Sequence, residues 1–137
     1  MLTVVAALIE AEGKLLVCQR RSGGVFELMW EFPGGKKNPA ETLEEALARE
    51  LREELGVTAR IGREVYRTRH RYAEMSQPIE LVFFVASADP AEMVNRVFEN
   101  IEWRMPESLR ELNFLPADRE LIEKLASGAL SISGLNL

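Results

Sequence analysis

This 137-residue sequence has only one cysteine, no long apolar run and no excess of positive charge. The single cysteine, Cys18, excludes an intrachain disulfide and a cysteine-ligated metal cluster, which fits a reducing, cytoplasmic location. No apolar run approaches the ~18 residues that are needed to span a membrane. The net charge of −5 disfavours polymeric DNA or RNA, whose phosphates attract basic surfaces. One nucleotide could still bind if cations screen the repulsion.

The residues that are present have the composition of a globular domain. Hydrophobic residues make up 47% of the sequence and charged residues 28%, and the length suits one domain with one core. No repeat, low-complexity tract or long linker divides the chain. We therefore expect one domain over residues 1–137, with a Ser/Gly-rich tail from about residue 127 whose structure the pattern does not determine.

Apolar and alternating segments predict strands over residues 2–9, 14–20, 30–32, 60–71, 79–86 and 101–104. Helical spacing predicts helices over residues 43–55 and 116–125. The two kinds of element mix without strict strand–helix alternation. The expected fold is therefore α/β (α+β), a mixed central sheet with helices on its faces.

The first predicted helix has clear boundary signals. Thr42, followed by Glu45 three residues later, forms a capping-box pattern at its start. Gly56 is suited to the left-handed position that ends a helix. These signals place the helix over residues 43–55.

Three carboxylates share one face of this helix. Glu50, Glu53 and Glu54 are neighbours at helical spacing, and they lie beside the apolar stripe that Leu43 and Leu47 begin. Like charges within one turn repel, and arginines or divalent cations can offset the repulsion. Mg²⁺ is typically held by a few carboxylates together with substrate phosphates. A solvated acidic face with ion pairs is the alternative interpretation.

The Gly34-Gly35 pair stands just before this helix. Glycine lets the backbone approach a ligand closely, and a helix N-terminus favours anions. Together with the carboxylates, the pair indicates a site for a metal ion and a phosphate.

The same residues resemble the Nudix box. Gly35, Glu41 and the run over residues 49–57 match every fixed position of that pattern, while residues 30–36 (WEFPGGK) and 114–118 (FLPAD) resemble its MutT branch. The resemblance extends from the first strand to about residue 125. It implies an α/β/α sandwich that hydrolyses nucleoside diphosphates linked to another moiety. MutT-like members cut nucleoside triphosphates to the monophosphate and pyrophosphate.

The resemblance also implies roles for the box residues. Arg49 would orient the glutamates, and Glu41 would hold the loop-to-helix geometry or tune a ligand. Mg²⁺ is the expected cation, with Mn²⁺ as an alternative, and it would polarise a water that attacks phosphorus. The implied metal ligands are Glu50, Glu53, Glu54 and the Gly34 carbonyl.

The general base has more than one candidate. Family members use a glutamate of the box or one from a later loop, so Glu53 and Glu50 compete with Glu99 of the RVFENIEW segment. For Glu99, a plain surface position is the alternative.

Asp118 is the candidate for reading the nucleobase. A carboxylate only accepts hydrogen bonds, so it favours a donor-rich edge such as the cytosine amino group or the N7–H of 8-oxoguanine. Capping of the last helix is the competing or additional role.

Four further residues are substrate-binding candidates. Phe32 and Tyr72 could stack on a base or simply pack in the core. Arg21 resembles a phosphate- or base-contacting arginine of MutT, although exposed arginines are common. Gly35 allows close approach of the substrate.

The sequence therefore predicts a Mg²⁺-dependent nucleoside triphosphate pyrophosphohydrolase that cleans nucleotide pools, with 8-oxo-dGTP as the first substrate. The nearest alternative is CTP or a 5-substituted pyrimidine nucleotide. An ADP-ribose or dinucleotide polyphosphate hydrolase and a non-catalytic nucleotide-binding module are less expected. The expected partner is a small nucleotide, with no polymeric nucleic acid and no membrane. Both a monomer and a homodimer are compatible with the sequence.

Overall fold

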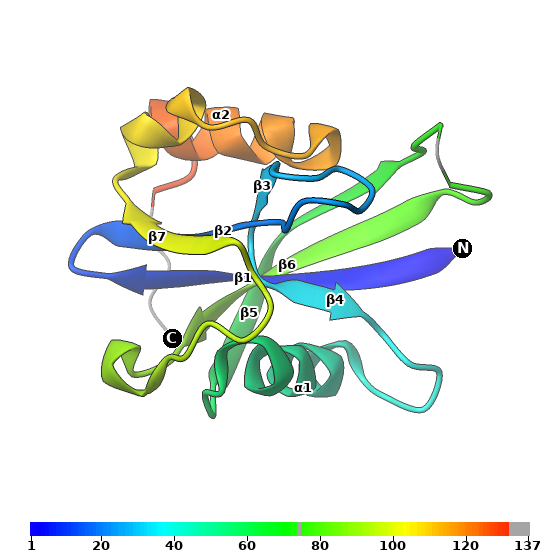
Figure 1. Ribbon diagram of the computed structural model, residues 1–137, viewed down its shortest axis with the longest axis horizontal. Helices are drawn as coiled ribbons and strands as arrows, with labels where there is room; N and C mark the ends of the chain where they lie inside the picture. The colour runs from blue at the N-terminus through cyan, green and yellow to red at the C-terminus, as the bar shows by residue number, and fades with distance from the viewer. Residues whose placement is uncertain (74, 132–137) are drawn as a thin grey trace.

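The computed structural model describes residues 1–73 and 75–131, which form a mixed sheet between two helical layers (Figure 1). The strands are β1 (Leu2–Ala11), β2 (Lys14–Gln19), β3 (Trp30–Glu31), β4 (Gly34–Lys36), β5 (Arg60–His70), β6 (Ile79–Ser87) and β7 (Asn100–Arg104). The α-helices are α1 (Leu43–Leu55) and α2 (Arg119–Ser127), and 3-10 turns occupy Pro90–Glu92, Pro106–Glu111 and Pro116–Asp118. The predicted tail beyond residue 131 lies outside the described residues.

The seven-stranded sheet is mixed because β1 pairs in parallel with β6 and antiparallel with β2 and β4. The main strand order is β3-β2-β1-β6-β5, with β7 paired to β2. β4 pairs with residues 4–6 of β1, whereas β2 pairs with residues 10 and 11. The sheet thus divides along β1, and β4 leads from this division into α1.

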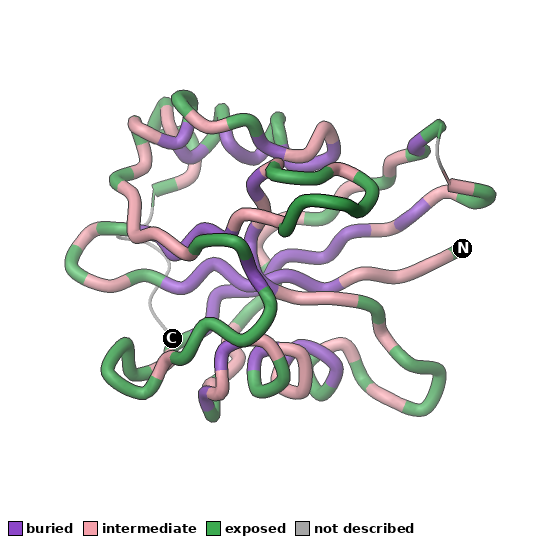
Figure 2. The backbone as a smooth tube through the Cα atoms, viewed as in Figure 1, coloured by how far each residue is buried: buried purple, intermediate pink, exposed green. Residues whose placement is uncertain are grey.

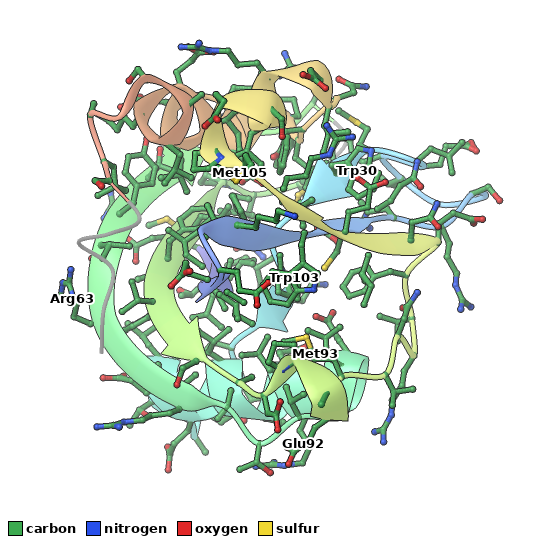
Figure 3. All side chains as sticks on the ribbon, turned by 90° about the vertical axis from the view of Figure 1, so that its left-hand side faces the viewer. Trp30, Arg63, Glu92, Met93, Trp103 and Met105 are labelled. Atoms are coloured by element: carbon green, nitrogen blue, oxygen red, sulfur yellow. The ribbon has the colours of Figure 1, made fainter. Side chains whose placement is uncertain are left out.

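Each face of the sheet is covered by one α-helix, and the buried strands lie between them (Figure 2). The face toward α1 buries Leu47, Leu51 and Leu55, and the face toward α2 buries Leu121 and Leu125. Figure 3 labels residues of both layers: Trp103 and Met93 pack on the α1 side, and Trp30 packs on the α2 side. The α/β/α arrangement predicted from the sequence is confirmed.

The first helix spans the predicted residues. Thr42 accepts a hydrogen bond from the Glu45 N–H at 3.1 Å, while Glu45 accepts one from the Thr42 N–H at 2.8 Å. Gly56 closes the helix with a left-handed φ of 67°. The local capping signals were therefore sufficient to place both ends of α1.

Two predicted segments differ in detail. Residues 116–118 form a 3-10 turn, and α2 begins only at Arg119. Residues 34–36, for which no strand was predicted, form β4. A Cβ on Gly34 would collide with the Val5 carbonyl oxygen, so the missing side chain is what allows this strand to pair with β1. None of the described helices is long and apolar enough to cross a membrane.

Candidate active site

Two cavities meet where β3 and β4 approach α1. The larger cavity has a volume of about 540 Å³, and its ionisable lining residues include Glu31, Glu50, Glu54 and Asp118. The smaller cavity, of about 290 Å³, is lined by Arg21, Ser22, Gly24, Val97 and Phe98 in addition to shared residues. The residues shared by both cavities are Arg20, Val25, Glu31 and Glu54.

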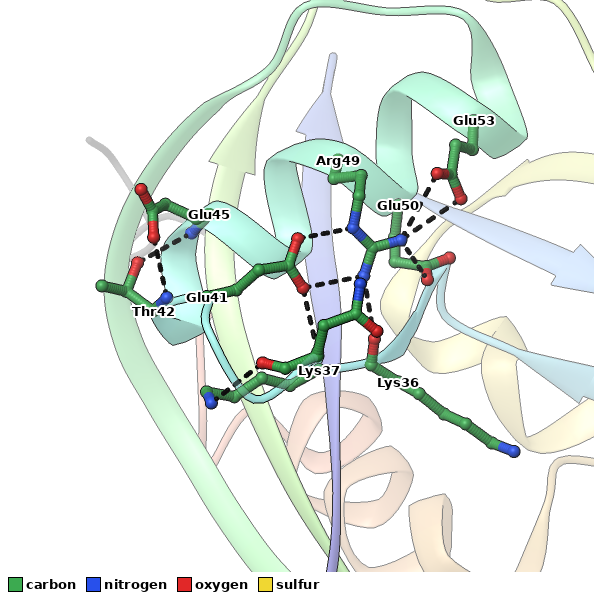
Figure 4. A network of polar contacts seen from close by, with 9 residues as sticks. Lys36, Lys37, Glu41, Thr42, Glu45, Arg49, Glu50 and Glu53 are labelled. Atoms are coloured by element: carbon green, nitrogen blue, oxygen red, sulfur yellow. Dashed lines mark hydrogen bonds and ion pairs between the residues drawn. The ribbon is translucent and has the colours of Figure 1, made fainter.

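Arg49 contacts the carboxylates of Glu41, Glu50 and Glu53 (Figure 4). Its Nε and Nη2 donate to the two oxygens of Glu41 at 2.6 and 3.0 Å. Its Nη1 donates to Glu50 Oε1 at 2.9 Å and to Glu53 Oε2 at 3.3 Å. Nη2 also reaches the Lys36 carbonyl oxygen at 3.0 Å, which ties the end of β4 to the helix. These contacts fix the guanidinium group of Arg49 between the loop before α1 and the glutamates of the helix.

Glu41 is stabilised as a carboxylate. The hydrogen bond from Arg49, together with one from the Asn38 N–H at 2.9 Å, lowers the Glu41 pKa to about 2. Glu41 therefore joins the loop before α1 to the middle of the helix.

Glu50 and Glu54 face inward, where their charge is less well compensated. A Cβ on Gly35 would lie 2.5 and 2.7 Å from the two carboxylate oxygens of Glu50, so Gly35 leaves the room that Glu50 occupies. Burial raises the Glu50 pKa despite the contact with Arg49. Burial and the charges of Glu31 and Glu50 raise the Glu54 pKa to about 8, although Glu54 accepts a hydrogen bond from the Gly34 N–H at 3.0 Å.

The donor atoms near α1 suit a hard divalent cation. Glu50, Glu53 and Glu54 offer carboxylate oxygens, and a cation would relieve the charge repulsion that raises the Glu54 pKa. Within the described ranges, no three His, Cys, Asp or Glu side chains already converge on one point. Arg49 Nη1 lies 3.3 Å from Glu53 Oε2, so a cation bound by Glu53 would compete with this ion pair.

Glu31 is a functional candidate that the sequence reasoning missed. It lines both cavities, and Arg20 Nη1 contacts its two carboxylate oxygens at 3.2 and 3.3 Å. Burial nevertheless raises the Glu31 pKa. The available signal was a carboxylate between two large aromatic residues, Trp30 and Phe32, both of which are buried. Such a charge in a short apolar strand indicates a polar cavity on one face.

Asp118 is buried in the larger cavity, with only 2% of its surface exposed. Its Oδ1 has no hydrogen-bond partner in the described part of the chain. Burial and the negative charge of Glu31 raise the Asp118 pKa well above its ordinary value. Asp118 occupies the N-cap position of α2 but makes no capping hydrogen bond, because its backbone continues the preceding 3-10 turn with φ −92° and ψ −12°. The capping alternative therefore lacks its defining contact.

Aromatic residues form the wall beside Asp118. The Tyr72 hydroxyl accepts a hydrogen bond from the Ala117 N–H at 3.1 Å, and its ring centroid lies 4.7 Å from that of Phe26. Phe26 is partly buried and also lines the larger cavity, so it is a second candidate that the sequence reasoning missed. Phe32 lines this cavity too, but its ring packs against the core residue Phe114 at 5.6 Å.

The two remaining predicted site residues, Arg21 and Glu99, lie in different surroundings. Arg21 is exposed and lines the smaller cavity. Glu99 is also exposed, but it lines neither cavity, and its N–H donates to the Gln19 carbonyl oxygen at 2.9 Å. The neighbouring Phe98 does line the smaller cavity, so the loop is close even though Glu99 is not brought to the box glutamates.

Comparisons of the sequence and the fold with known proteins identify a family and several similar proteins. The family model described as NUDIX domain matches residues 4–124. A CTP pyrophosphohydrolase of Escherichia coli K12 is 36% identical over 123 residues, which cover 90% of each chain. The nucleoside triphosphatase NudI of Enterobacter sp. (strain 638) is 37% identical over 129 residues, covering 85% of this chain and 91% of NudI. The MutT protein of Methanosarcina mazei Go1 has a TM-score of 0.82 at 25% identity, covering 95% of this chain and 96% of that one.

The chain therefore belongs to the Nudix family. It is a Nudix hydrolase whose solved structural neighbours include MutT proteins, as the sequence predicted.

Proposed function

We propose that this protein hydrolyses a nucleoside triphosphate to the monophosphate and pyrophosphate with Mg²⁺, and that it prefers a cytosine nucleotide. The observation that carries the base preference is the buried, unpartnered Oδ1 of Asp118 in the larger cavity. The similar proteins named CTP pyrophosphohydrolase and nucleoside triphosphatase support the pyrimidine alternative better than the first expectation, 8-oxo-dGTP. Mn²⁺ remains the second cation to test.

The base preference follows from the acceptors in the larger cavity. In their ionised form Asp118 and Glu31 only accept hydrogen bonds, so they favour a base edge that carries N–H groups. Burial raises the pKa of both groups in the free protein, and N–H donors of a bound base would counteract this rise by stabilising the carboxylates. The exocyclic amino group of cytosine offers two N–H donors. Uracil would present an oxygen acceptor at the same place, facing oxygens that are already under-supplied with donors. Leaving such buried groups unpaired costs ~1–3 kcal/mol each, which is enough for selectivity of tenfold or more.

The reaction would take place beside α1. Mg²⁺, when bound, would neutralise the polyphosphate and lower the pKa of an attacking water. The water oxygen bonds to a phosphorus of the α–β linkage, and the bond from that phosphorus to the bridging oxygen breaks. The bonding electron pair stays on the bridging oxygen, and a proton of the water passes to a base. Glu53 and Glu50 are better placed as this base than Glu99, because they belong to the glutamate network of α1.

A substrate panel tests the proposal. The protein is incubated with CTP, 5-methyl-dCTP, UTP, dGTP, 8-oxo-dGTP, ADP-ribose or a diadenosine polyphosphate at low concentration, with Mg²⁺ or Mn²⁺. Chromatography then measures the monophosphate and pyrophosphate that form. The highest kcat/KM is expected for the cytosine nucleotides. A strong preference for 8-oxo-dGTP over them would overturn the proposed base, and preference for ADP-ribose would overturn the triphosphate class.

Asp118→Asn tests the role of Asp118 directly. An amide donates as well as accepts, so the variant is expected to lose at least part of the selectivity for CTP over UTP while turnover of its best substrate changes less. The measurement is the ratio of kcat/KM for the two nucleotides in wild type and variant. An unchanged ratio would leave Asp118 without a role in choosing the base.

A further inference from the structure

We propose that Tyr72 is a positioning residue for the choice of base. Its hydroxyl group holds the 3-10 turn Pro116–Asp118 in the orientation that presents Asp118 to the larger cavity. This inference deepens the proposed function and rests on it. It gives the hydroxyl of Tyr72 a role that is separate from stacking of its ring on a base.

The 3-10 turn takes its capping contact from a distant segment. The first N–H groups of a helical turn have no acceptor within the turn itself. Among the described residues, neither Leu115, which precedes the turn, nor Asp118 at its end makes a side-chain capping bond. The Ala117 N–H instead donates to the Tyr72 hydroxyl at 3.1 Å, in a buried contact between residues 45 positions apart. The cap therefore does not use the Asp118 carboxyl group, which stays available to a ligand.

The ring that carries this hydroxyl is itself held in place. Only 6% of Tyr72 is exposed. Its ring centroid lies 4.7 Å from that of Phe26 and 4.3 Å from that of His70, with interplanar angles of 53° and 56°. Because these contacts restrict the ring, little further side-chain freedom is lost when the hydroxyl accepts the Ala117 N–H. The hydroxyl oxygen is thus a fixed acceptor.

The segment before the turn is held at its other end by β3. The Trp30 N–H donates to the Asn113 carbonyl oxygen at 2.9 Å, and the Leu115 N–H donates to the Trp30 carbonyl oxygen at 3.0 Å. Glu31, the next residue of β3, lines the same cavity as Asp118. The bonds to Trp30 are made by the backbone, so a side-chain substitution does not remove them. The Tyr72 hydroxyl is the contact of the turn that a single substitution can delete.

Tyr72→Phe deletes the hydroxyl and keeps the ring. The ratio of kcat/KM for CTP to that for UTP is expected to fall about three- to tenfold, mainly through KM, because the Ala117 N–H loses a buried acceptor and the turn can move. Tyr66→Phe is the matched control. The Tyr66 hydroxyl contacts Glu120 and Thr68 instead, and Tyr66 lines neither cavity. The control should keep the wild-type ratio.

A double variant tests whether Tyr72 acts through Asp118. If it does, adding Tyr72→Phe to Asp118→Asn should lower the ratio little further, because the two changes remove the same selectivity. A merely structural role of the hydroxyl would lower kcat/KM for both nucleotides equally and would add to the effect of Asp118→Asn. An equal or fully additive loss, or an unchanged ratio in Tyr72→Phe, would overturn the inference.

Amide hydrogen exchange tests the contact without turnover. The Ala117 N–H is expected to exchange at least several-fold faster in Tyr72→Phe than in wild type, relative to the N–H groups of β6 in the same protein. Equal relative exchange in the two proteins would overturn the inference whether or not CTP is hydrolysed. Absent CTP hydrolysis by the wild type would instead overturn the proposed function, so the two failures are distinguishable.

Discussion

Two sets of carboxyl groups at the candidate site differ in their environment. The outer carboxylates, Glu41 and Glu53, are held by Arg49, and the pKa of Glu41 falls to about 2. The inner carboxyls, Glu31, Glu54 and Asp118, line the larger cavity, and the pKa of Glu54 rises to about 8. Burial therefore raises the pKa of the inner carboxyls, whereas hydrogen bonds from Arg49 and a backbone N–H lower the pKa of Glu41.

The outer carboxylates form a frame, meaning the contacts that hold the loop before α1 to the helix. The inner carboxyls form the surface that would bind a ligand. The contacts of the outer carboxylates are supplied by the chain, and they fix the loop before α1 to the helix. Among the inner carboxyls, Glu31 contacts Arg20 and Glu54 accepts a hydrogen bond from the Gly34 N–H, but Asp118 Oδ1 has no partner among the described residues. A cation and a donor-bearing base are the ligands that would satisfy these carboxyl groups.

The largest effect on turnover is expected from a change at Glu53, which contacts Arg49 and is also a candidate metal ligand. Glu53→Gln removes a candidate ligand charge without changing the size of the side chain, so turnover is expected to fall about 100-fold or more. The Glu53 side chain is 59% exposed, so the melting temperature should hardly change. Glu44→Gln is the matched control, because Glu44 is exposed on the first turn of the same helix. Wild-type turnover in Glu53→Gln would refute the metal-site assignment.

Gly35→Ala tests how closely the position of the Glu50 carboxylate depends on the missing side chain of Gly35. The added Cβ would collide with the carboxylate of Glu50, and a displacement near 1 Å at a reacting centre costs about 100-fold in rate. We expect kcat to fall between about tenfold and 100-fold. Glu50→Asp shortens the side chain and restores room. Adding Gly35→Ala to Glu50→Asp should therefore cost little, and a full additive loss in the double variant would contradict the steric explanation.

Asp118→Asn should change how the stability of the protein depends on pH. A carboxyl whose pKa is raised on folding binds its proton more tightly in the folded state. Its contribution to stability therefore falls as pH rises from the ordinary value of 3.8 toward the raised pKa. The amide does not titrate, so the melting temperature of the variant relative to wild type is expected to increase from pH 4 to pH 8. Each unit of pKa shift corresponds to ~1.4 kcal/mol. A difference that does not vary with pH would contradict the raised pKa.

The outer frame was largely predictable from the sequence because it is local. The capping residues, the ends of α1 and the spacing of Glu50, Glu53 and Glu54 all follow from helical periodicity within a few turns. The strand boundaries were close for the same reason, because short-range alternation reports burial on one face.

The inner cavity was less predictable because it depends on contacts between distant segments. Glu31, Phe26 and Asp118 come from separate parts of the chain, and only the folded sheet brings them to one cavity. The strand β4 was missed because its pairing depends on the close approach of Gly34 to Val5, which no local pattern reports. Asp118 was predicted as a site residue, but its missing capping bond required the geometry of the 3-10 turn.

The smallest effect is expected from Glu41→Gln, which weakens the frame without touching the cavity. Because the Glu41 pKa is lowered to about 2, its ionised form stabilises the fold fully above the ordinary value of 4.5, and this contribution disappears as pH falls through about 2. The melting temperature of the variant should therefore lie slightly below that of wild type at pH 5 to 7, and the two should converge as the pH approaches 2. Thermal unfolding over this range measures the difference, with Glu44→Gln as the control. A gap that persists at pH 2 would mean that Glu41 acts through packing rather than through its charge on Arg49.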